Sequence, residues 1–241
     1  MIGPKAIKDL SPSERERVVG RSRPDIESVK STVARIVDDV RGRGDAAVIE
    51  YTARLDGIRL EPHQLLVGKE EIKAARQSVP RAVVRALERS VRNVRRFHEA
   101  QLRPGEWMIE VERGVRVGRA RRPIASVGLY VPGGRAAYPS TVVMLAVPAR
   151  VAGVERTVMC TPPARDGSVN PATLVAADLA GVDAIYRIGG AQAIAAMAFG
   201  TETVEKVDKI VGPGNIYVAA AKSLVYGYVD TDLPAGPSEV L

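Results

Sequence analysis

The sequence has few of the residues from which many kinds of catalytic and metal sites are built. It holds one cysteine, Cys160, which excludes an intramolecular disulfide framework and fits a reducing compartment. Its two histidines, His63 and His98, lie in the first half with no partner at ligand spacing. We therefore expect neither a zinc site nor a Ser-His-Asp triad that is built wholly from this chain.

Long apolar runs and aromatic side chains are also scarce. The longest apolar run, TVVMLAVPARVAGV, is broken by Pro148 and Arg150, and the N-terminus lacks the apolar core of a signal peptide. We therefore expect a cytoplasmic protein with no membrane partner. Although the net charge is +7, aromatic residues make up only 4% of the chain, which is few for a protein that stacks on single-stranded nucleic acid. Nucleic-acid binding is thus a minor hypothesis.

What the chain does contain is typical of a folded domain, with 46% hydrophobic and 26% charged residues. Before residue 105 the pattern is helical. A stripe of Ile and Val residues predicts a helix that stops at Gly42 or Gly44, and Asp45 is expected to cap the next helix. Residues 79–103 carry one apolar face and a stripe of arginines on another: Arg85, Arg89, Arg92 and Arg96. We interpret this helix as core-packing with a solvated basic face, and a polyanion site is the alternative.

Beyond residue 105 the pattern changes to strands. Residues 106–124 predict a hairpin that turns near Arg113-Gly114. Strand, glycine-rich loop and helix then alternate to the end of the chain, with Asn170 as a helix cap and Pro171 in a first turn. Strands that alternate with helices of this length form βαβ units, so the sequence predicts an α/β fold with a parallel sheet.

Three loops leave strand ends with glycine and enter helices: YVPGGR, IGGAQ and VGPGNIY. In an open parallel sheet ligands bind beyond the carboxyl ends of the strands, and helix N-termini there suit phosphate. Tyr130, Gln192 and Asn215 stand at these loop ends. The spacing favours ligand contact and helix capping equally for the two amides. A G-x-G-x-x-G motif is absent, and no acidic residue for a ribose can be assigned after the first glycine loop.

The segment VGPGNIYVAAAKSLVYGYVDTDLPAGPSEVL closely resembles the signature region of histidinol dehydrogenases. RGDAAVIEYTARLDG, PIASVGLYVPGGRAAYPSTVVMLAVPARVAGV and YRIGGAQAIAAMAFGT resemble that family too, in the same order. The resemblance implies an incomplete Rossmann-like NAD-binding domain over residues 126–241, of aldehyde-dehydrogenase-like architecture. It implies that residues 1–125, helices plus a hairpin, belong to a first domain whose sheet is completed by other sequence.

The resemblance also implies an activity and a set of ligands. Members of this family use NAD twice to oxidise L-histidinol through histidinal to L-histidine, with a zinc ion that holds the substrate, and they form homodimers. Carried over residue by residue, Tyr130, Gln192 and Asn215 match NAD contacts, and Ser238 of AGPSE matches a substrate-binding serine.

In the family the zinc ligands and a Glu-His acid/base pair follow the AGPSE motif, where this chain ends. The resemblance therefore implies an N-terminal portion with no catalytic residue and no metal ligand of its own, and we expect the 241-residue chain alone to be inactive. An alternative of another class is a non-catalytic NAD-binding or assembly module that needs a separate C-terminal half.

Overall fold

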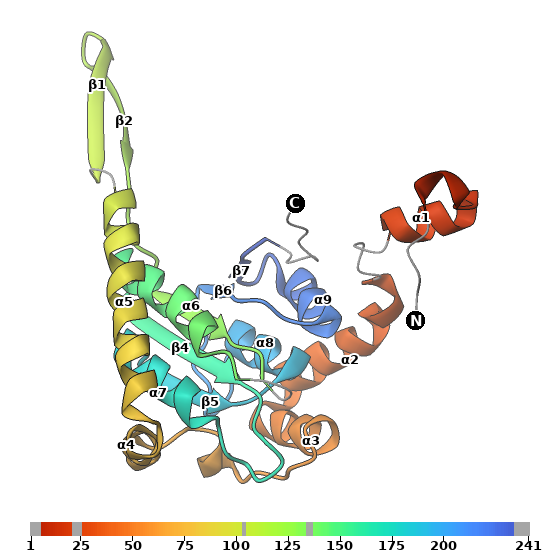
Figure 1. Ribbon diagram of the computed structural model, residues 1–241. Coiled ribbons are helices and arrows are strands. Elements are labelled where there is room, and N and C mark those ends of the chain that lie inside the picture. The colour runs from red at the N-terminus through yellow and green to blue at the C-terminus, as the bar shows by residue number, and fades with distance from the viewer. Residues whose placement is uncertain (1–5, 21–25, 103–104, 134–136, 234–241) are drawn as a thin grey trace.

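The structure, a computed structural model, describes residues 6–20, 26–102, 105–133 and 137–233. A parallel sheet of five strands lies at its centre, in the spatial order β5-β4-β3-β6-β7 (Figure 1). The strands are β3 (Ser126–Tyr130), β4 (Arg156–Thr161), β5 (Ala184–Arg187), β6 (Lys209–Val211) and β7 (Asp230–Thr231).

The strand order identifies the topology. From β3 the chain steps outward to β4 and β5, then crosses back to add β6 and β7 on the other side of β3. Counted from β3 this is the order 3-2-1-4-5, which is the Rossmann order without a sixth strand among the described residues. The predicted incomplete Rossmann-like sheet is thereby confirmed, and its topological switch point lies between β3 and β6.

Four helices that connect these strands cover the two faces of the sheet. Side chains alternate along each strand, so Leu129 and Met159 enter the core on one face while Tyr130 and Cys160 enter the core on the other. The first face is covered by α6 and α7, and the second by α8 and α9. The bounds are α6 (Pro139–Val151), α7 (Pro171–Ala180), α8 (Gly190–Phe199) and α9 (Ile216–Val225).

Helices from the first part of the chain form an outer layer on both sides. The pair α2 (Glu27–Arg43) and α3 (Asp45–Leu55) packs against α8 and α9. The pair α4 (Lys69–Ser78) and α5 (Arg81–Gln101) packs against α6 and α7. The two predicted regions, 1–125 and 126–241, thus contribute to the same two cores, and their division into domains stays a proposal. Two short helices, η1 (Ile7–Asp9) and α1 (Pro12–Gly20), precede these four helices in the chain.

The junction between α2 and α3 corrects one prediction. The residue before α3 is Gly44, at φ +56°, and Asp45 is the first helical residue rather than the cap. The carboxylate of Glu202, from the loop before β6, instead accepts a hydrogen bond from the Asp45 N–H at 2.7 Å. Asp45 is buried and its own carboxylate accepts hydrogen bonds from Thr201 and Thr203. A distant loop therefore caps this helix.

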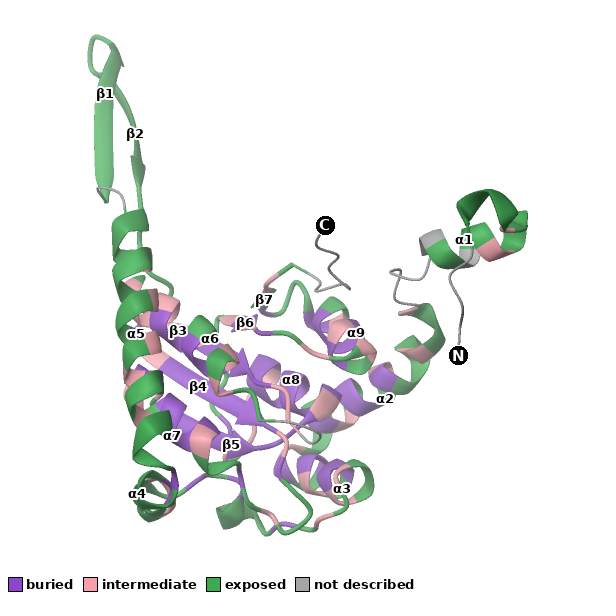
Figure 2. Cartoon of the chain, in the orientation of Figure 1, coloured by how far each residue is buried: buried purple, intermediate pink, exposed green. Residues whose placement is uncertain are grey.

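The long helix α5 has the two faces that its sequence predicts. Leu87 and Val91 are buried against the core shared with α6 and α7. The four arginines of the basic stripe are exposed on the outside of the molecule: Arg85, Arg89, Arg92 and Arg96. Figure 2 shows this division as a green outer side of α5 and a purple and pink inner side. The core-packing interpretation of this helix is confirmed.

A short extended segment covers the outer edge of β5. After η2 (Pro62–Gln64), the N–H of Val67 donates to the carbonyl of Ile185 and the N–H of Arg187 donates to the carbonyl of Leu65, both at 2.8 Å. The segment pairs antiparallel to the strand at Leu66. The sequence pattern gave no sign of this pairing, because the segment is only three residues long.

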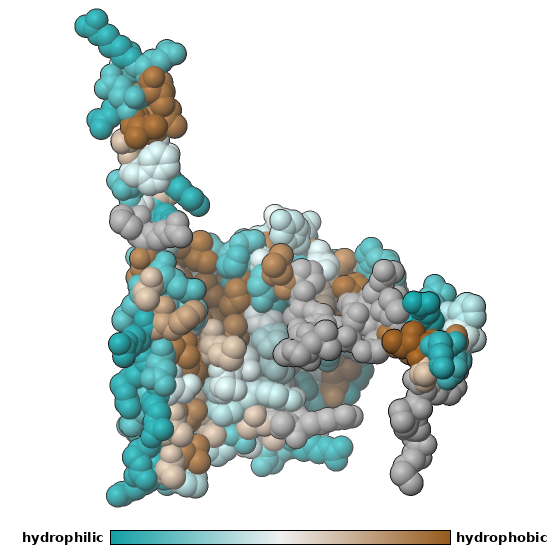
Figure 3. Space-filling model, turned by 45° about the horizontal axis from the view of Figure 1, so that its top comes forward, coloured by the Kyte–Doolittle hydropathy of each residue, from teal (hydrophilic) through white to brown (hydrophobic). Residues whose placement is uncertain are grey.

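The predicted hairpin is confirmed as β1 (Glu106–Glu112) and β2 (Val115–Ala120), with its turn at Gly114, φ +84°. It projects away from the sheet beyond the end of α5 (Figure 1), and every residue of both strands is exposed. Figure 3 shows apolar side chains gathered on one part of it. Trp107, Met108 and Ile109 each expose more than half of their surface. In the described part of the chain, no helix is both long and apolar enough to span a membrane.

Candidate functional site

A cavity of about 830 Å³ opens at the carboxyl end of the sheet. Its walls come from the loops that follow β3, β4, β5 and β6, from the middle of α2 and from the end of α3. It therefore lies at the switch point, where open α/β sheets bind their ligands, and its volume falls in the usual range for a small-molecule site. Tyr130, Gln192 and Asn215 all line it, so the structure brings the three predicted cofactor residues together.

Tyr130 is the last residue of β3, and its side chain reaches toward the start of α8. Its hydroxyl oxygen accepts a hydrogen bond from the Gly190 N–H at 3.0 Å. Burial raises the pKa of Tyr130 to about 12, so the phenol is neutral at physiological pH and its O–H remains able to donate. Tyr130 thus ties β3 to the first turn of α8 and brings a hydrogen-bond donor to the cavity.

Gln192 is completely buried, yet neither its Oε1 nor its Nε2 has a hydrogen-bond partner among the described residues. Leaving a buried donor or acceptor without a partner costs about 1–3 kcal/mol for each group. Such groups are rare in folded proteins, and each calls for a physical reason. Because this amide lines the cavity, a ligand that offers both a donor and an acceptor would satisfy it.

Asn215 plays a different part. It is the N-cap of α9, where its Oδ1 accepts hydrogen bonds from the N–H groups of Tyr217 and Val218 at 3.0 and 3.1 Å. Helix capping is therefore confirmed for Asn215, and Gln192 makes no such bond. Capping uses only the amide oxygen of Asn215, so its amide nitrogen is still available to a ligand in the cavity.

Two glycines in the loops at the carboxyl end of the sheet have backbone conformations that favour glycine. Gly190 has φ +60°, and a Cβ on it would lie 2.7 Å from Gln192 Oε1. Gly212, at φ +128°, would place a Cβ 2.1 Å from the carbonyl oxygen of Tyr130. Both conformations are ones that L side chains rarely adopt. Gly212 therefore lets the loop after β6 approach the end of β3 closely, and Gly190 leaves room for the Gln192 side chain in the first turn of α8.

One residue of the cavity, Asp56, was not predicted from the sequence. The Asp56-Gly57 pair follows α3 and indicates only the end of a helix. In the structure Asp56 lines the cavity, and its Oδ2 is buried with no hydrogen-bond partner among the described residues. Burial raises the pKa of Asp56 to about 6. Only the packing of α3 against α8 places this carboxyl at the site, and no local sequence signal reports that contact.

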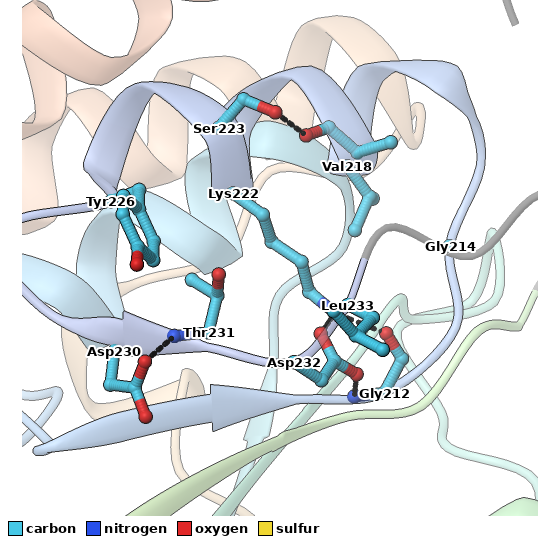
Figure 4. A pocket seen from close by; sticks show the side chains of 11 residues that line it. Gly212, Gly214, Val218, Lys222, Ser223, Tyr226, Asp230, Thr231, Asp232 and Leu233 are labelled. Atoms are coloured by element: carbon cyan, nitrogen blue, oxygen red, sulfur yellow. Dashed lines mark hydrogen bonds and ion pairs between the residues drawn. The ribbon is translucent and has the colours of Figure 1, made fainter.

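A second cavity, of about 430 Å³, lies between α9, β7 and the loop that follows β6 (Figure 4). Lys222 is 7% exposed and points from α9 toward Asp232, whose Oδ1 it contacts at 2.5 Å, and it also donates to the Gly212 carbonyl. The other oxygen of Asp232 accepts from the Gly212 N–H at 2.8 Å. Lys222 and Asp232 therefore hold the glycine loop that leads to Asn215.

The remaining chemically reactive residues form no site among the described residues. His63 lies in η2 and His98 in α5, and no group of three or more His, Cys, Asp or Glu side chains could hold a metal ion within the described ranges. Cys160 is fully buried in β4, and burial raises the pKa of its thiol, which keeps it unreactive. The predicted substrate residue Ser238 lies outside the described residues.

Comparison with known proteins places this geometry in a family. The family model for histidinol dehydrogenase matches residues 19–241. The chain belongs to the histidinol dehydrogenase family. It is 57% identical over 224 residues to the histidinol dehydrogenase of Methanothermobacter thermautotrophicus, an alignment that covers 93% of this chain and 52% of that protein. With the histidinol dehydrogenase of Clostridium acetobutylicum it shares 56% identity over 210 residues, 87% of this chain and 48% of that protein.

A solved structure agrees with these sequence relatives. The crystal structure of histidinol dehydrogenase from Elizabethkingia anophelis superposes with a TM-score of 0.85 at 41% identity. The match covers 95% of this chain and 52% of the solved one. The chain thus spans about half the length of the histidinol dehydrogenases that it matches.

Proposed function

We propose that this chain forms the NAD-binding part of an enzyme that oxidises L-histidinol through histidinal to L-histidine, the last two steps of histidine biosynthesis. The observation that carries the proposal is the fully buried amide of Gln192, which has no hydrogen-bond partner within the described ranges and belongs to a cavity at the switch point of a Rossmann-like sheet. A free amide in that position is unfavourable unless a ligand pairs with it. The oxidoreductase family to which the chain belongs supports a dinucleotide as that ligand.

The residues around the cavity fit such a ligand. The first turns of α8 and α9 bring backbone N–H groups and the positive ends of two helix dipoles to the cavity, which suits a pyrophosphate. Tyr130 would donate its O–H, and the amide of Gln192 would offer both an acceptor and a donor. Asn215 would add its amide nitrogen. When bound, NAD supplies the acceptor for the hydride of the substrate.

A zinc ion does not fit the described residues in the same way. They contain no cluster of three or more metal-ligating side chains, so no residue described here is assigned to the metal. The resemblance to the family supports zinc ligands and an acid/base pair in sequence beyond the AGPSE motif, with Ser238 as a substrate contact. Homodimer formation and a cytoplasmic location are proposed on that resemblance alone.

Titration calorimetry of the chain with NAD tests the cofactor proposal. In Gly190→Ala the new Cβ would displace the Gln192 amide, because it lies 2.7 Å from Oε1. Gly181→Ala is a matched control: Gly181 has φ +81°, so it carries a similar backbone strain, but it lies at the end of α7 and does not line the cavity. We expect about tenfold weaker NAD binding in Gly190→Ala and unchanged binding in Gly181→Ala. Equal affinities in both variants would contradict the proposed site.

The oxidation itself needs a longer protein for its test. A chimera would join this chain to the remaining length of the Methanothermobacter thermautotrophicus relative, with which it shares 57% identity. We expect NADH formation from L-histidinol by the chimera, and a raised KM for NAD when it carries Gly190→Ala. A folded chimera that binds NAD and forms no NADH from L-histidinol would contradict the proposed substrate.

A further inference from the structure

The second strand of a Rossmann sheet ordinarily ends at an acidic residue that binds the ribose of the dinucleotide. In this chain the second strand is β4, and it runs into Thr161, Pro162 and Pro163, none of which carries a carboxylate. The place where a ribose is usually recognised therefore has no carboxylate from its own strand.

A carboxylate reaches this place from another part of the chain. Asp56 follows α3, and its position relative to β4 can be read from Gly189, the residue before α8. A Cβ on Gly189 would lie 2.6 Å from Pro162 Cβ and 3.4 Å from Asp56 Oδ1. The Asp56 carboxyl and the loop after β4 thus meet over the same glycine, at the wall of the 830 Å³ cavity.

We propose that Asp56 accepts hydrogen bonds from the adenosine ribose hydroxyls of the bound dinucleotide and thereby selects NAD over NADP. The inference rests on the proposed NAD-binding function and adds to it the residue that sets cofactor preference. Its basis is geometric. Among the residues that the structure describes, the buried Oδ2 of Asp56 has no hydrogen-bond partner, and the amide of Gln192, which lines the same cavity, has none either. An ionised carboxylate only accepts hydrogen bonds, so it suits hydroxyl donors and repels a 2′-phosphate.

The charged and titratable groups around Asp56 determine how the affinity of the chain for NAD should vary with pH. Tyr130 from β3 is neutral at physiological pH, and Arg54 from α3 and Arg165 from the loop after β4 also line the cavity. The Arg54 guanidinium lies over the ring of Tyr51 at 4.5 Å, and both arginines have exposed side chains. Burial raises the pKa of Asp56 to about 6. Because hydroxyl donors stabilise the ionised form, we expect NAD to bind more tightly as the pH rises through about 6.

The experiment measures the affinities of the chain for NAD, NADP and 2′-deoxy-NAD by titration calorimetry. The test variant is Asp56→Asn, which keeps the shape of the side chain and removes its charge. The control is Asp38→Asn, an equal change of charge at an exposed position on α2 that does not line the cavity. Urea unfolding of each variant checks that it is folded.

In the parent chain we expect NAD to bind at least about tenfold more tightly than either NADP or 2′-deoxy-NAD. Asp56→Asn should reduce both ratios to about threefold or less, and Asp38→Asn should leave them unchanged. If the parent chain binds NAD and Gly190→Ala weakens it, but Asp56→Asn leaves the ratios unchanged, the role of Asp56 is overturned and the proposed function stands. If the parent chain binds neither dinucleotide, both are overturned.

Discussion

Replacement of Gln192 by methionine should make the protein more stable while it weakens NAD binding. Gln192 is fully buried in the first turn of α8, and both polar atoms of its amide lack a partner among the described residues. Methionine has a similar length and no hydrogen-bonding requirement, and its flexible thioether adapts to irregular space. The substitution therefore removes the unsatisfied amide and keeps the volume of the core.

The magnitude follows from two opposing effects. Each unsatisfied buried polar group costs about 1–3 kcal/mol, and the amide has two of them. A volume-conserving change in a packed core usually costs less than about 1.5 kcal/mol. We therefore expect the free energy of unfolding to rise by at least about 0.5 kcal/mol. Since the same change removes an acceptor and a donor for the ligand, the affinity for NAD should fall at least about tenfold.

Urea unfolding followed by far-ultraviolet circular dichroism measures the first effect. Tryptophan fluorescence is unsuitable, because the single tryptophan, Trp107, is exposed on the hairpin and does not belong to either core. Gln77→Met, at an exposed position on α4, is the matched control and should leave both stability and NAD affinity within error. A loss of stability in Gln192→Met would refute the reasoning, since it would mean that the amide is already satisfied without a ligand.

Three further predictions concern buried titratable groups. Burial raises the folded-state pKa of Asp56 to about 6, so the contribution of this group to stability is lost as the pH rises from about 4 through 6. The urea midpoints at pH 4.5 and pH 7 should therefore differ less in Asp56→Asn than in the parent chain. An equal difference in both proteins would contradict this. Cys160 is fully buried with a raised thiol pKa, so Ellman's reagent should label the chain only after unfolding; rapid labelling of the native protein would count against that burial. Asp45→Ala should lower the free energy of unfolding by about 2–3 kcal/mol in urea titrations, because it leaves the Thr201 and Thr203 hydroxyls without their acceptor, and a change below about 0.5 kcal/mol would disagree.

The strands and most helices follow from the sequence because their signals are local. The segments RTVMCT and KIV match β4 and β6 residue for residue, since each is a short apolar run bounded by turn residues or charges. The switch-point cavity follows from the strand order that βαβ units impose. The contacts that join distant segments could not be predicted from the sequence, such as the contact of Glu202 with the start of α3 or the position of Asp56 at the cavity.

The two amides show why spacing alone left their roles open. Asn215 stands one residue before α9 begins, at the position from which a side-chain oxygen reaches the first free N–H groups. Gln192 comes shortly after the pair Gly189-Gly190, but α8 begins at Gly190. Gln192 is therefore already the third helical residue, and its side chain does not cap the helix. A shift of a few residues in the start of a helix separates a structural cap from a ligand contact, and helix boundaries are the part of a structure that sequence defines least well.

The segment at residues 65–67 makes the two edges of the sheet different. Its hydrogen bonds with Ile185 and Arg187 occupy the backbone groups that β5 would otherwise offer to another chain. Among the described residues, the opposite border is the two-residue strand β7. A further strand can therefore pair directly with β7, whereas β5 is already paired along its outer edge by residues 65–67.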